Sequence, residues 1–368
     1  MSSTPPVVLL TGATGLVGSG LLKFLLLAQP ERRVVALVRR RDSLPASLRR
    51  ESVTLIEGNV TRPWLGLDRP SLLGLKAAVS EIIHCAADTR FGLGLDQARA
   101  TNTLGTANLL RVAEECPRLT KFTHLSTAYV AGRLQGTILE APLVHAAGFC
   151  NTYQESKYEA EQLVVEAMKK IPAAIFRLST IFGDAATGQV RQFNYVHRLL
   201  KLLPRNLLPI APGDPAARID LIPSDWALPA LARVHEEGFV PGRVYHVCAG
   251  PEGSLSVPEL GELTLRAYEA HPLGQRWLPI RLPVLVSLAE YEEFVKTRQR
   301  GSNPLLKELS RALGHFLPHL AMVQFFDNRN LTEALVQSDL RLPSIREYYE
   351  KVLSYCLESD WHTSLGSE

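Results

Sequence analysis

The stretch VVLLTGATGLVG, residues 7–18, passes from an apolar run into a glycine-rich turn. The run Val7–Leu10 predicts a buried strand. Apolar residues then recur at helical spacing, at Leu16, Val17, Leu21, Phe24 and Leu25. A second apolar run, Arg33–Val38, predicts the next strand. Strand, turn, helix and strand make a βαβ unit, which indicates an α/β fold.

The same alternation of strands and helices continues along the chain. Further strands are predicted at Ser52–Ile56, Glu81–Cys85, Lys121–Ser126, Ala173–Leu178, Arg218–Ile222 and Arg243–Val247. Helices are predicted at Leu95–Glu115, at Thr152–Lys170 and over residues 224–234. This order predicts a Rossmann-like, doubly wound parallel sheet with helices on both faces.

The rhythm changes after Gly183, where proline-rich apolar segments and then helical patterns follow. We therefore expect a cofactor-binding Rossmann domain over residues 1–184, with late strands from about 218–249 added to its sheet. Residues 185–217 and 250–368 are expected to form a smaller, mostly helical C-terminal lobe that binds substrate.

Composition narrows the class of function. The chain has 368 residues, of which 46% are hydrophobic, and its 40 basic and 37 acidic residues give a net charge of +3. That charge balance gives no reason to expect nucleic-acid binding. The five cysteines are widely spaced and form no CxxC, and no HExxH occurs, so we expect neither a metal site nor a disulfide framework. The absence of a secretory signal and of a long apolar span favours a cytoplasmic location.

The glycines at 12, 15 and 18 have a chemical use in this setting. Glycine permits a tight turn and a close approach of phosphate to the backbone, and the helix that follows offers free N–H groups at its positive end. The turn with its flanking strands and helix therefore predicts a dinucleotide site. The alternative is a purely structural turn.

The end of the second strand reads ALVRRRDS, residues 36–43. An acidic residue here would bind the ribose 2′-hydroxyl of NADH, whereas arginine accommodates the 2′-phosphate of NADPH. Arg39 and Arg40 follow the strand directly, while Asp42 comes too late, so the sequence favours NADPH. A solvated basic turn, and with it NADH, is the alternative.

Tyr153 and Lys157 are four residues apart in the predicted helix and therefore lie on one helical face. A free phenol has a pKa near 10, and a neighbouring ammonium together with a positive nicotinamide ring favours its ionised form. The pair is either an acid–base device or two surface residues, and only its structural context decides.

Several spaced motifs carry a family resemblance. TGATGLVG is followed by EGNV at 57–60, HCAADTRF at 84–91, STAYVAG at 126–132 and YQESK at 153–157. In order and spacing these motifs resemble the extended short-chain dehydrogenase/reductase superfamily, which is epimerase/dehydratase-like. Together with NTLGTANLL at 102–110 and SKYEAEQLV at 156–164, they look like the branch that holds fatty acyl-CoA reductases and thioester reductase domains. The resemblance covers roughly residues 7–250.

The resemblance implies catalytic roles. Tyr153 would donate a proton to the carbonyl oxygen, and Lys157 would support it and bind the nicotinamide ribose. Thr127 would orient the carbonyl, with Ser126 as the runner-up; both hydroxyls have the alternative of capping the backbone at a strand end.

The resemblance also implies a cofactor site. Asn59 and Val60 would contact adenine, Ala86 and Ala87 the ribose, and Leu178–Ile181 the carboxamide. The full set of expected cofactor contacts is Gly12, Thr14, Gly15, Leu16, Val17, Gly18, Arg39, Arg40, Asn59, Val60, Ala86, Ala87, Ser126, Tyr153, Lys157, Leu178, Thr180 and Ile181. His84 is interpreted as a structural strand histidine.

The predicted function is reduction of a carbonyl by NADPH. The first hypothesis for the substrate is an acyl thioester on CoA or an acyl carrier protein, reduced to an aldehyde or alcohol. The alternatives are a ketone on a bulky apolar metabolite, sugar-nucleotide epimerisation, and a non-catalytic NADP(H) sensor. The apolar segments at 199–213 and 278–291 are lobe core, a hydrophobic substrate funnel or a contact with a membrane surface. A homodimer is a further possibility within this superfamily.

Overall fold

The computed structural model of the chain describes residues 6–300 and 314–362. Its centre is a seven-stranded sheet with the order β12-β7-β5-β4-β1-β2-β3. Every neighbouring pair in this sheet is parallel. The strands are β1 (Val7–Thr11), β2 (Arg33–Val38), β3 (Val53–Glu57), β4 (Glu81–His84), β5 (Lys121–Thr127), β7 (Ala173–Leu178) and β12 (Val244–Val247). The predicted Rossmann-like sheet is confirmed.

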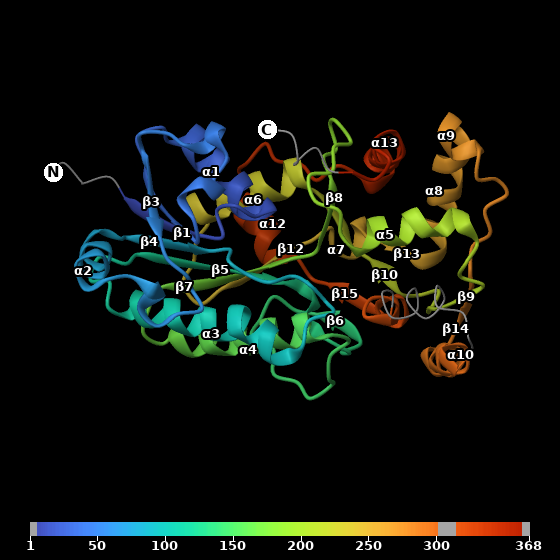
Figure 1. Cartoon of the computed structure of the whole chain (residues 1–368), viewed down its shortest axis with the longest axis horizontal. Coiled ribbons are helices and arrows are strands. Elements are labelled where there is room, and N and C mark those ends of the chain that lie inside the picture. The colour runs from blue at the N-terminus through green and yellow to red at the C-terminus, as the bar shows by residue number, and fades with distance from the viewer. Residues whose placement is uncertain (1–5, 301–313, 363–368) are drawn as a thin grey trace.

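Helices cover both faces of this sheet (Figure 1). On one face lie α1 (Leu16–Ala28) and α6 (Ser224–Glu236), and on the other lie α2 (Arg69–Ala78), α3 (Leu95–Glu114) and α4 (Thr152–Ala167). Strand residues alternate between the two layers: Val8 and Leu10 pack with the α1 and α6 side, and Val7 and Leu9 with the α2 and α3 side. This period of two explains why the strands read as continuous apolar runs.

The strand order reverses between β1 and β4, which are hydrogen-bonded neighbours. In open parallel sheets, ligands bind outside the carboxyl ends of the strands at such a switch point. Thr11 and His84 are register partners at this end of the two strands. The glycine turn follows β1 directly, so it lies at the switch point.

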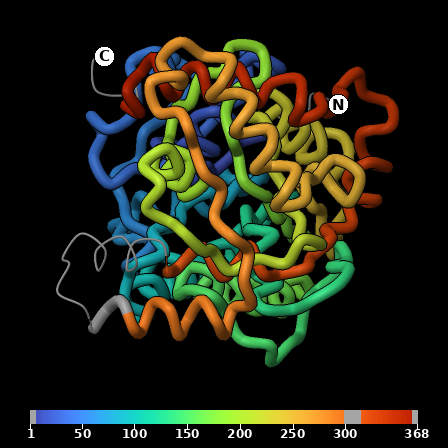
Figure 2. Tube along the Cα trace, turned by 90° about the vertical axis from the view of Figure 1, so that its right-hand side faces the viewer, coloured from blue at the N-terminus to red at the C-terminus, as the bar shows by residue number. Residues whose placement is uncertain are grey.

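The second part of the molecule is a lobe with its own core (Figure 1). It contains α5 (Tyr195–Leu202), β9 (Ile210–Pro212), α8 (Val257–Ala270), α9 (Pro272–Gln275), β14 (Val284–Val286), α10 (Leu288–Arg300) and α13 (Ile345–Glu358). Helices α13 and α10 lie at opposite ends of the lobe in both views (Figure 2). The two apolar segments lie side by side, because β9 pairs with β14. Leu200 and Leu203 are buried in the lobe core, whereas Val284 is 65% exposed.

The late strand predicted at Arg218–Ile222 was wrong in its placement. The chain forms two short strands here, and neither joins the seven-stranded sheet: β10 (Arg218–Ile219) pairs with β13 (Leu255–Ser256), and β11 (Leu221–Pro223) pairs with β8 (Thr180–Gly183). Asp220 separates them, and its carboxylate accepts hydrogen bonds from the N–H groups of Ala249 and Gly250. Of the two predicted late strands, only β12 extends the main sheet.

Residues 314–326, which we call the strap, connect the lobe to the main domain. The strap contains η6 (Leu317–Ala321) and β15 (Gln324–Phe326), and β15 pairs in parallel with β6 (Gly136–Ile138). The Gln324 side-chain amide donates to the carbonyls of Gly132 and Leu134 at 3.0 and 2.8 Å. Through β15, the strap therefore adds a strand beside β6, in the segment that follows β5 along the chain.

The remaining short elements are η1 (Arg41–Ser43), η2 (Ala46–Leu48), η3 (Pro63–Gly66), η4 (Ala128–Ala131), η5 (Leu203–Arg205), α7 (Gly250–Gly253) and α12 (Arg329–Leu335). Among all helices in residues 6–300 and 314–362, none combines the length and apolar character that crossing a bilayer requires. The ranges expected for the two domains also include residues 1–5, 301–313 and 363–368, which lie outside the described residues.

Candidate active site

The glycine turn forms a tight cradle at the switch point. Gly12 has φ +71°, and a Cβ on it would lie 2.6 Å from the Ala86 nitrogen. A Cβ on Gly18 would lie 2.1 Å from the Gly12 carbonyl oxygen. Gly15 precedes α1, and no side chain caps this helix end. Thr14 and Gly15 are exposed, while Leu16 and Val17 are half-buried. The open N–H groups and the missing side chains fit a dinucleotide phosphate.

His84 hydrogen-bonds to two threonine side chains next to the glycine turn, and one of them, Thr11, directly precedes Gly12. Its Nδ1 lies 2.7 Å from Thr11 Oγ1 and its Nε2 lies 3.0 Å from Thr106 Oγ1. Thr11 Oγ1 also accepts a hydrogen bond from the Ala86 N–H at 3.2 Å, and Ala87 beside it is half-buried. Burial, aided by the charge of Lys157, lowers the pKa of His84 to about 3. His84 is therefore neutral and satisfied at both nitrogens, as expected for a structural histidine.

The predicted adenine contacts have roles in local structure. Asn59 Oδ1 accepts a hydrogen bond from the Thr61 N–H at 3.0 Å. Val60 is buried, and its carbonyl accepts from the Asn108 side chain at 2.9 Å. These contacts hold the turn after β3, which lies at the edge of the sheet.

The predicted arginines after β2 are both exposed. Arg40 Nε lies 3.4 Å from Asp42 Oδ1, an exposed pair that is weak in water. The pKa of Asp88 lies below its ordinary value, mainly because of the hydrogen bond with Arg90. The charge of Arg39 makes a smaller contribution in the same direction. Both guanidinium groups are therefore available to an anionic ligand near the switch point.

Tyr153 lies in the first turn of α4, and that turn is fixed on several sides. Asn151 caps the helix by accepting from the Gln154 N–H at 3.0 Å, and its amide donates to the His315 carbonyl at 3.1 Å. Burial raises the pKa of Tyr153 to about 12, and a hydrogen bond with Thr127 acts in the opposite direction. The phenol is thus protonated at neutral pH and faces the Thr127 hydroxyl.

Lys157 is the buried cation of the site, with 2% exposure. Its Nζ donates to the Leu125 carbonyl at 2.7 Å and lies 3.3 Å from His124 Nε2. Burial lowers the pKa of Lys157 to about 8, while Glu161 and Cys85 favour its charged form. The sequence predicted that Lys157, together with the positive nicotinamide ring, favours the ionised form of Tyr153. In the structure burial is the largest influence on the pKa of Tyr153, and Lys157 donates its hydrogen bond to β5.

The other predicted residues line the ends of β5, β7 and β8. Ser126 is buried, and its hydroxyl has no hydrogen-bond partner within the described part of the chain. Leu178 is buried at the end of β7. Thr180 hydrogen-bonds to the Tyr129 hydroxyl at 2.9 Å, and the Ile181 carbonyl accepts from the Asn194 amide at 2.7 Å.

An aromatic wall that sequence reasoning missed stands beside Tyr153. The Phe91 ring stacks on Tyr153 with a centroid distance of 5.5 Å and lies 5.4 Å from Tyr195 of α5. Phe316 of the strap stacks on Tyr195 at 3.8 Å, and His319 meets the edge of Tyr129 at 5.2 Å. The wall therefore joins the main domain, the lobe and the strap around one phenol.

Part of this wall had a signal in the sequence. Phe91 ends the quoted motif HCAADTRF, and Tyr129 lies in STAYVAG. Tyr129 and Tyr195 share a hydrogen bond of 2.8 Å. Tyr195, Phe316 and His319 lie outside the quoted motifs, and only the tertiary fold brings them to Tyr153.

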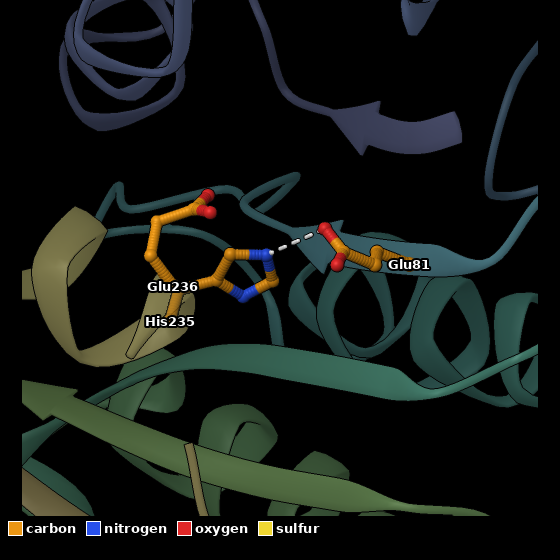
Figure 3. Close-up of side chains that lie close together, drawn as sticks. All are labelled: Glu81, His235 and Glu236. Carbon is orange, nitrogen blue, oxygen red and sulfur yellow. Dashed lines mark hydrogen bonds and ion pairs between the residues drawn. The ribbon is translucent and has the colours of Figure 1, made fainter. Parts of the chain in front are cut away.

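A second buried polar cluster lies at the opposite, amino-terminal end of β4 and β5 (Figure 3). The ligand atoms of Glu81, His235 and Glu236 lie within 4.8 Å of one another, a spacing that a metal ion would accept. However, Arg32 forms a two-pronged hydrogen bond with Glu236, and Lys121 Nζ lies 3.8 Å from Glu81. Because these cations already match both carboxylates, we interpret the cluster as a structural ion-pair network.

Comparison with known proteins agrees with this geometry. Residues 10–231 match the NAD-binding family described as "Male sterility protein". The chain is 32% identical over 228 residues to the isonitrile lipopeptide synthase of Streptomyces coeruleorubidus, covering 56% of this chain and 15% of that protein. It is 21% identical to fatty acyl-CoA reductase 1 of Arabidopsis thaliana, over 80% of this chain and 77% of that one. The chain spans between 7% and 34% of the length of four of the synthases and synthetases it matches.

Solved structures show the same fold. The terminal R domain from the myxalamid PKS-NRPS pathway superposes with a TM-score of 0.79 at 24% identity, covering 99% of this chain and 93% of that one. The R domain of a nonribosomal peptide synthetase from Mycobacterium tuberculosis gives a TM-score of 0.67 at 23% identity, over 97% and 94% of the two chains. The family match extends over more than half of the chain, from within β1 to within α6. The chain therefore belongs to the NAD-binding "Male sterility protein" family and is an NAD(P)-dependent oxidoreductase of the extended short-chain dehydrogenase/reductase type.

Proposed function

We propose that the chain is an NADPH-dependent reductase that acts on the carbonyl of an acyl thioester carried by CoA or by a carrier protein. The observation that carries this proposal is the meeting of Thr127, Tyr153 and Lys157 at the carboxyl end of β5, next to the cradle formed by Gly12 and Gly18. This end of a doubly wound sheet is where ligands bind.

Each side chain has a distinct role in the proposed mechanism. The bound cofactor supplies the hydride. Thr127 orients the carbonyl oxygen through its hydroxyl, and Tyr153 donates the proton to that oxygen. A pKa of about 12 keeps Tyr153 in the protonated, donating form at neutral pH. Lys157 stabilises the phenolate that remains, because a nearby positive charge favours the ionised form.

Two observations support a thioester as substrate. The matched relatives include a fatty acyl-CoA reductase and several peptide synthetases, and the superposed structures are R domains of such synthetases. The wall of Phe91, Tyr195 and Phe316 offers an apolar surface beside Tyr153, as small-molecule sites commonly do. A carrier protein would then be the partner that delivers the acyl group.

The choice of NADPH rests on Arg39 and Arg40, since no acidic residue stands at the end of β2. Replacing both with alanine should reduce the preference for NADPH over NADH about tenfold, the effect of losing a charged hydrogen bond to phosphate. The measurement is the dissociation constant of each cofactor by titration. An unchanged preference would remove the two arginines from the 2′-phosphate site.

The substrate is tested with purified protein, NADPH and two carbonyl compounds, a long-chain acyl-CoA and an apolar ketone. Oxidation of the cofactor is followed by absorbance, and the products are identified by mass. Aldehyde or alcohol together with free CoA is the expected result. Reaction with the ketone alone would replace the thioester by a small hydrophobic metabolite, and tight NADPH binding without turnover of either compound would favour a sensor.

A further inference from the structure

A buried histidine that the proposed mechanism does not use contacts Lys157. His124 lies on β5, three residues before Thr127, and is fully buried. Its Nε2 lies 3.3 Å from Lys157 Nζ, while its Nδ1 has no hydrogen-bond partner among residues 6–300 and 314–362. We propose that His124 is a positioning residue, whose Nε2 accepts a hydrogen bond from the Lys157 ammonium and directs it toward Tyr153 and the cofactor. This inference rests on the proposed function, in which Lys157 supplies the positive charge.

The chemistry of the contact fixes the tautomer of His124. An ammonium group has three N–H donors and no acceptor, so His124 Nε2 must accept and the ring proton must lie on Nδ1. That Nδ1–H is then buried without an acceptor, which is a costly arrangement for a polar group. The contact with Lys157 is the interaction that favours this tautomer over the other one.

His84 shows what a histidine with only a structural role looks like in the same place. The His84 and His124 rings lie 5.4 Å apart, and both residues are buried. Both nitrogens of His84 are bonded to threonine hydroxyls, so its ring supports the glycine turn. His124 has Lys157 in place of such hydroxyls.

The contacts of Lys157 leave one donor for the reaction. Its Nζ donates to the Leu125 carbonyl at 2.7 Å and lies 3.3 Å from His124 Nε2. Two of the three N–H groups are therefore directed at β5, and neither contact uses the third. Without His124, the ammonium would have one fixed acceptor and would be free to rotate.

The surrounding charges determine the direction of the expected pH effect. His84 and Cys85 face Lys157 from the end of β4, and Glu161 faces it from the next turn of α4. Glu161 is hydrogen-bonded to Arg177 of β7 at 2.8 Å. Burial together with Lys157 lowers the pKa of His124 well below its ordinary value, so His124 is neutral. Its removal takes away an acceptor and no charge, and Lys157 should then lose its proton at a lower pH.

The test compares His124→Leu, His124→Gln and Thr123→Val over pH 6 to 10, with turnover of a long-chain acyl-CoA and NADPH binding as readouts. In His124→Leu, the alkaline limb of both profiles should move down by about one pH unit, the effect of losing one hydrogen bond to the charged form. His124→Gln should keep the limb near that of the wild type, because its amide oxygen can accept. Thr123 contacts His235 on the other face of the sheet, so Thr123→Val controls for damage to β5.

An unmoved alkaline limb in His124→Leu, or an equal shift in Thr123→Val, would overturn the inference. Should these variants fail to fold, ¹⁵N-histidine spectra of the wild-type protein decide: a proton on Nδ1 of His124 supports the inference, and one on Nε2 refutes it. Lys157→Met and Tyr153→Phe keep the two proposals apart. Full turnover in those variants would defeat the proposed function, whereas their inactivity beside an unshifted His124→Leu would defeat only the role of His124.

Discussion

The two ends of β4 and β5 carry buried polar clusters that differ in charge balance. At the amino-terminal end, Glu81 and Glu236 are matched by Arg32 and Lys121. At the carboxyl end, Lys157 contacts a carbonyl and a neutral imidazole, and the nearby carboxylate of Glu161 is bonded to Arg177. The same strands thus hold a balanced cluster at one end and a cation without its own counter-ion at the other.

This difference in charge balance predicts that the cluster at the amino-terminal end serves stability and the cluster at the carboxyl end serves catalysis. Matched charges hold elements together, since each one is uncompensated if its partner is lost. A buried cation that contacts only neutral atoms, beside an unpartnered Ser126 hydroxyl, is costly for folding and is typical of a site that meets a charged ligand or intermediate. We therefore expect variants at the carboxyl end to lose activity and variants at the amino end to lose stability.

The largest effect is expected for Tyr153→Phe. Turnover should fall by roughly 10²–10⁴-fold, the usual contribution of a positioned proton donor, while NADPH affinity and thermal stability stay near those of the wild type. The measurement is steady-state kinetics together with cofactor titration. Tyr158→Phe is the matched control, because that hydroxyl lies in the same helix and accepts from the His145 N–H at 3.3 Å. Full turnover in Tyr153→Phe would refute the mechanism.

Arg32→Met, at the amino-terminal end of the strands, is expected to lose stability and to keep its activity. Arg32 is 3% exposed and binds Glu236 with two nitrogens, so its loss leaves that largely buried carboxylate without its partner. The free energy of unfolding should fall by about 3–5 kcal/mol with kcat unchanged. Urea denaturation measures the first quantity and steady-state kinetics the second.

Arg233→Met provides the control for that variant. Arg233 forms an exposed pair with Glu237 at 2.8 Å, and its loss should cost less than about 1 kcal/mol. If Arg32→Met lost turnover at unchanged stability, it would be wrong to assign stability to the amino-terminal end of the strands and catalysis to the carboxyl end.

Gly18→Ala should have a smaller effect, confined to the cofactor. A Cβ there would lie 2.1 Å from the Gly12 carbonyl oxygen, whereas one on Gly74, in α2, would meet nothing within 4 Å. The cradle must shift in the first variant and is untouched in the second. NADPH affinity should therefore fall about tenfold or more in Gly18→Ala and change little in Gly74→Ala, as measured by fluorescence titration. Equal affinities in both variants would show that phosphate does not approach this turn.

The sequence predicted the sheet and the cradle because both follow from local patterns. Apolar runs, glycine spacing and helical periodicity are readable within about ten residues, and the strands β1, β2, β3, β4, β5 and β7 of the main sheet follow them. The strand at Arg218–Ile222 was misplaced because an apolar run specifies extension and not its partner. Asp220 inside that run binds the N–H groups of Ala249 and Gly250, a contact that no local pattern predicts.

The site was predicted in the same uneven way. Tyr153 and Lys157 were singled out by their spacing on one helix, and their expected roles came from the family resemblance. The partners that define their surroundings come from distant segments: Phe316 of the strap and Tyr195 of the lobe meet beside Phe91. The balanced cluster was missed for the same reason, since Arg32 and Glu236 are 204 residues apart and read as ordinary surface charges.

The smallest expected effect concerns the pH dependence of stability. Burial would raise the pKa of Glu81, but His235, Arg32 and Lys121 together hold it below its ordinary value of 4.5. The unfolded chain therefore binds this proton more readily than the folded one, so stability rises with pH in this range. The contribution of Glu81 should be fully present above the ordinary value and disappear as the pH falls through the lowered pKa.

Denaturation of the wild type and of Glu81→Gln between pH 7 and 3 measures this contribution as a gap between the two curves. The gap should narrow toward the acid end, because protonated Glu81 resembles glutamine in charge. Glu166→Gln is the control, since that carboxylate is 70% exposed and pairs only with Lys169 among its described contacts. Its gap should stay small at every pH. A gap for Glu81→Gln that stays constant down to pH 3 would mean that the amino-end cluster is held by packing and hydrogen bonds more than by charge, and the contrast with Lys157 would lose its electrostatic basis.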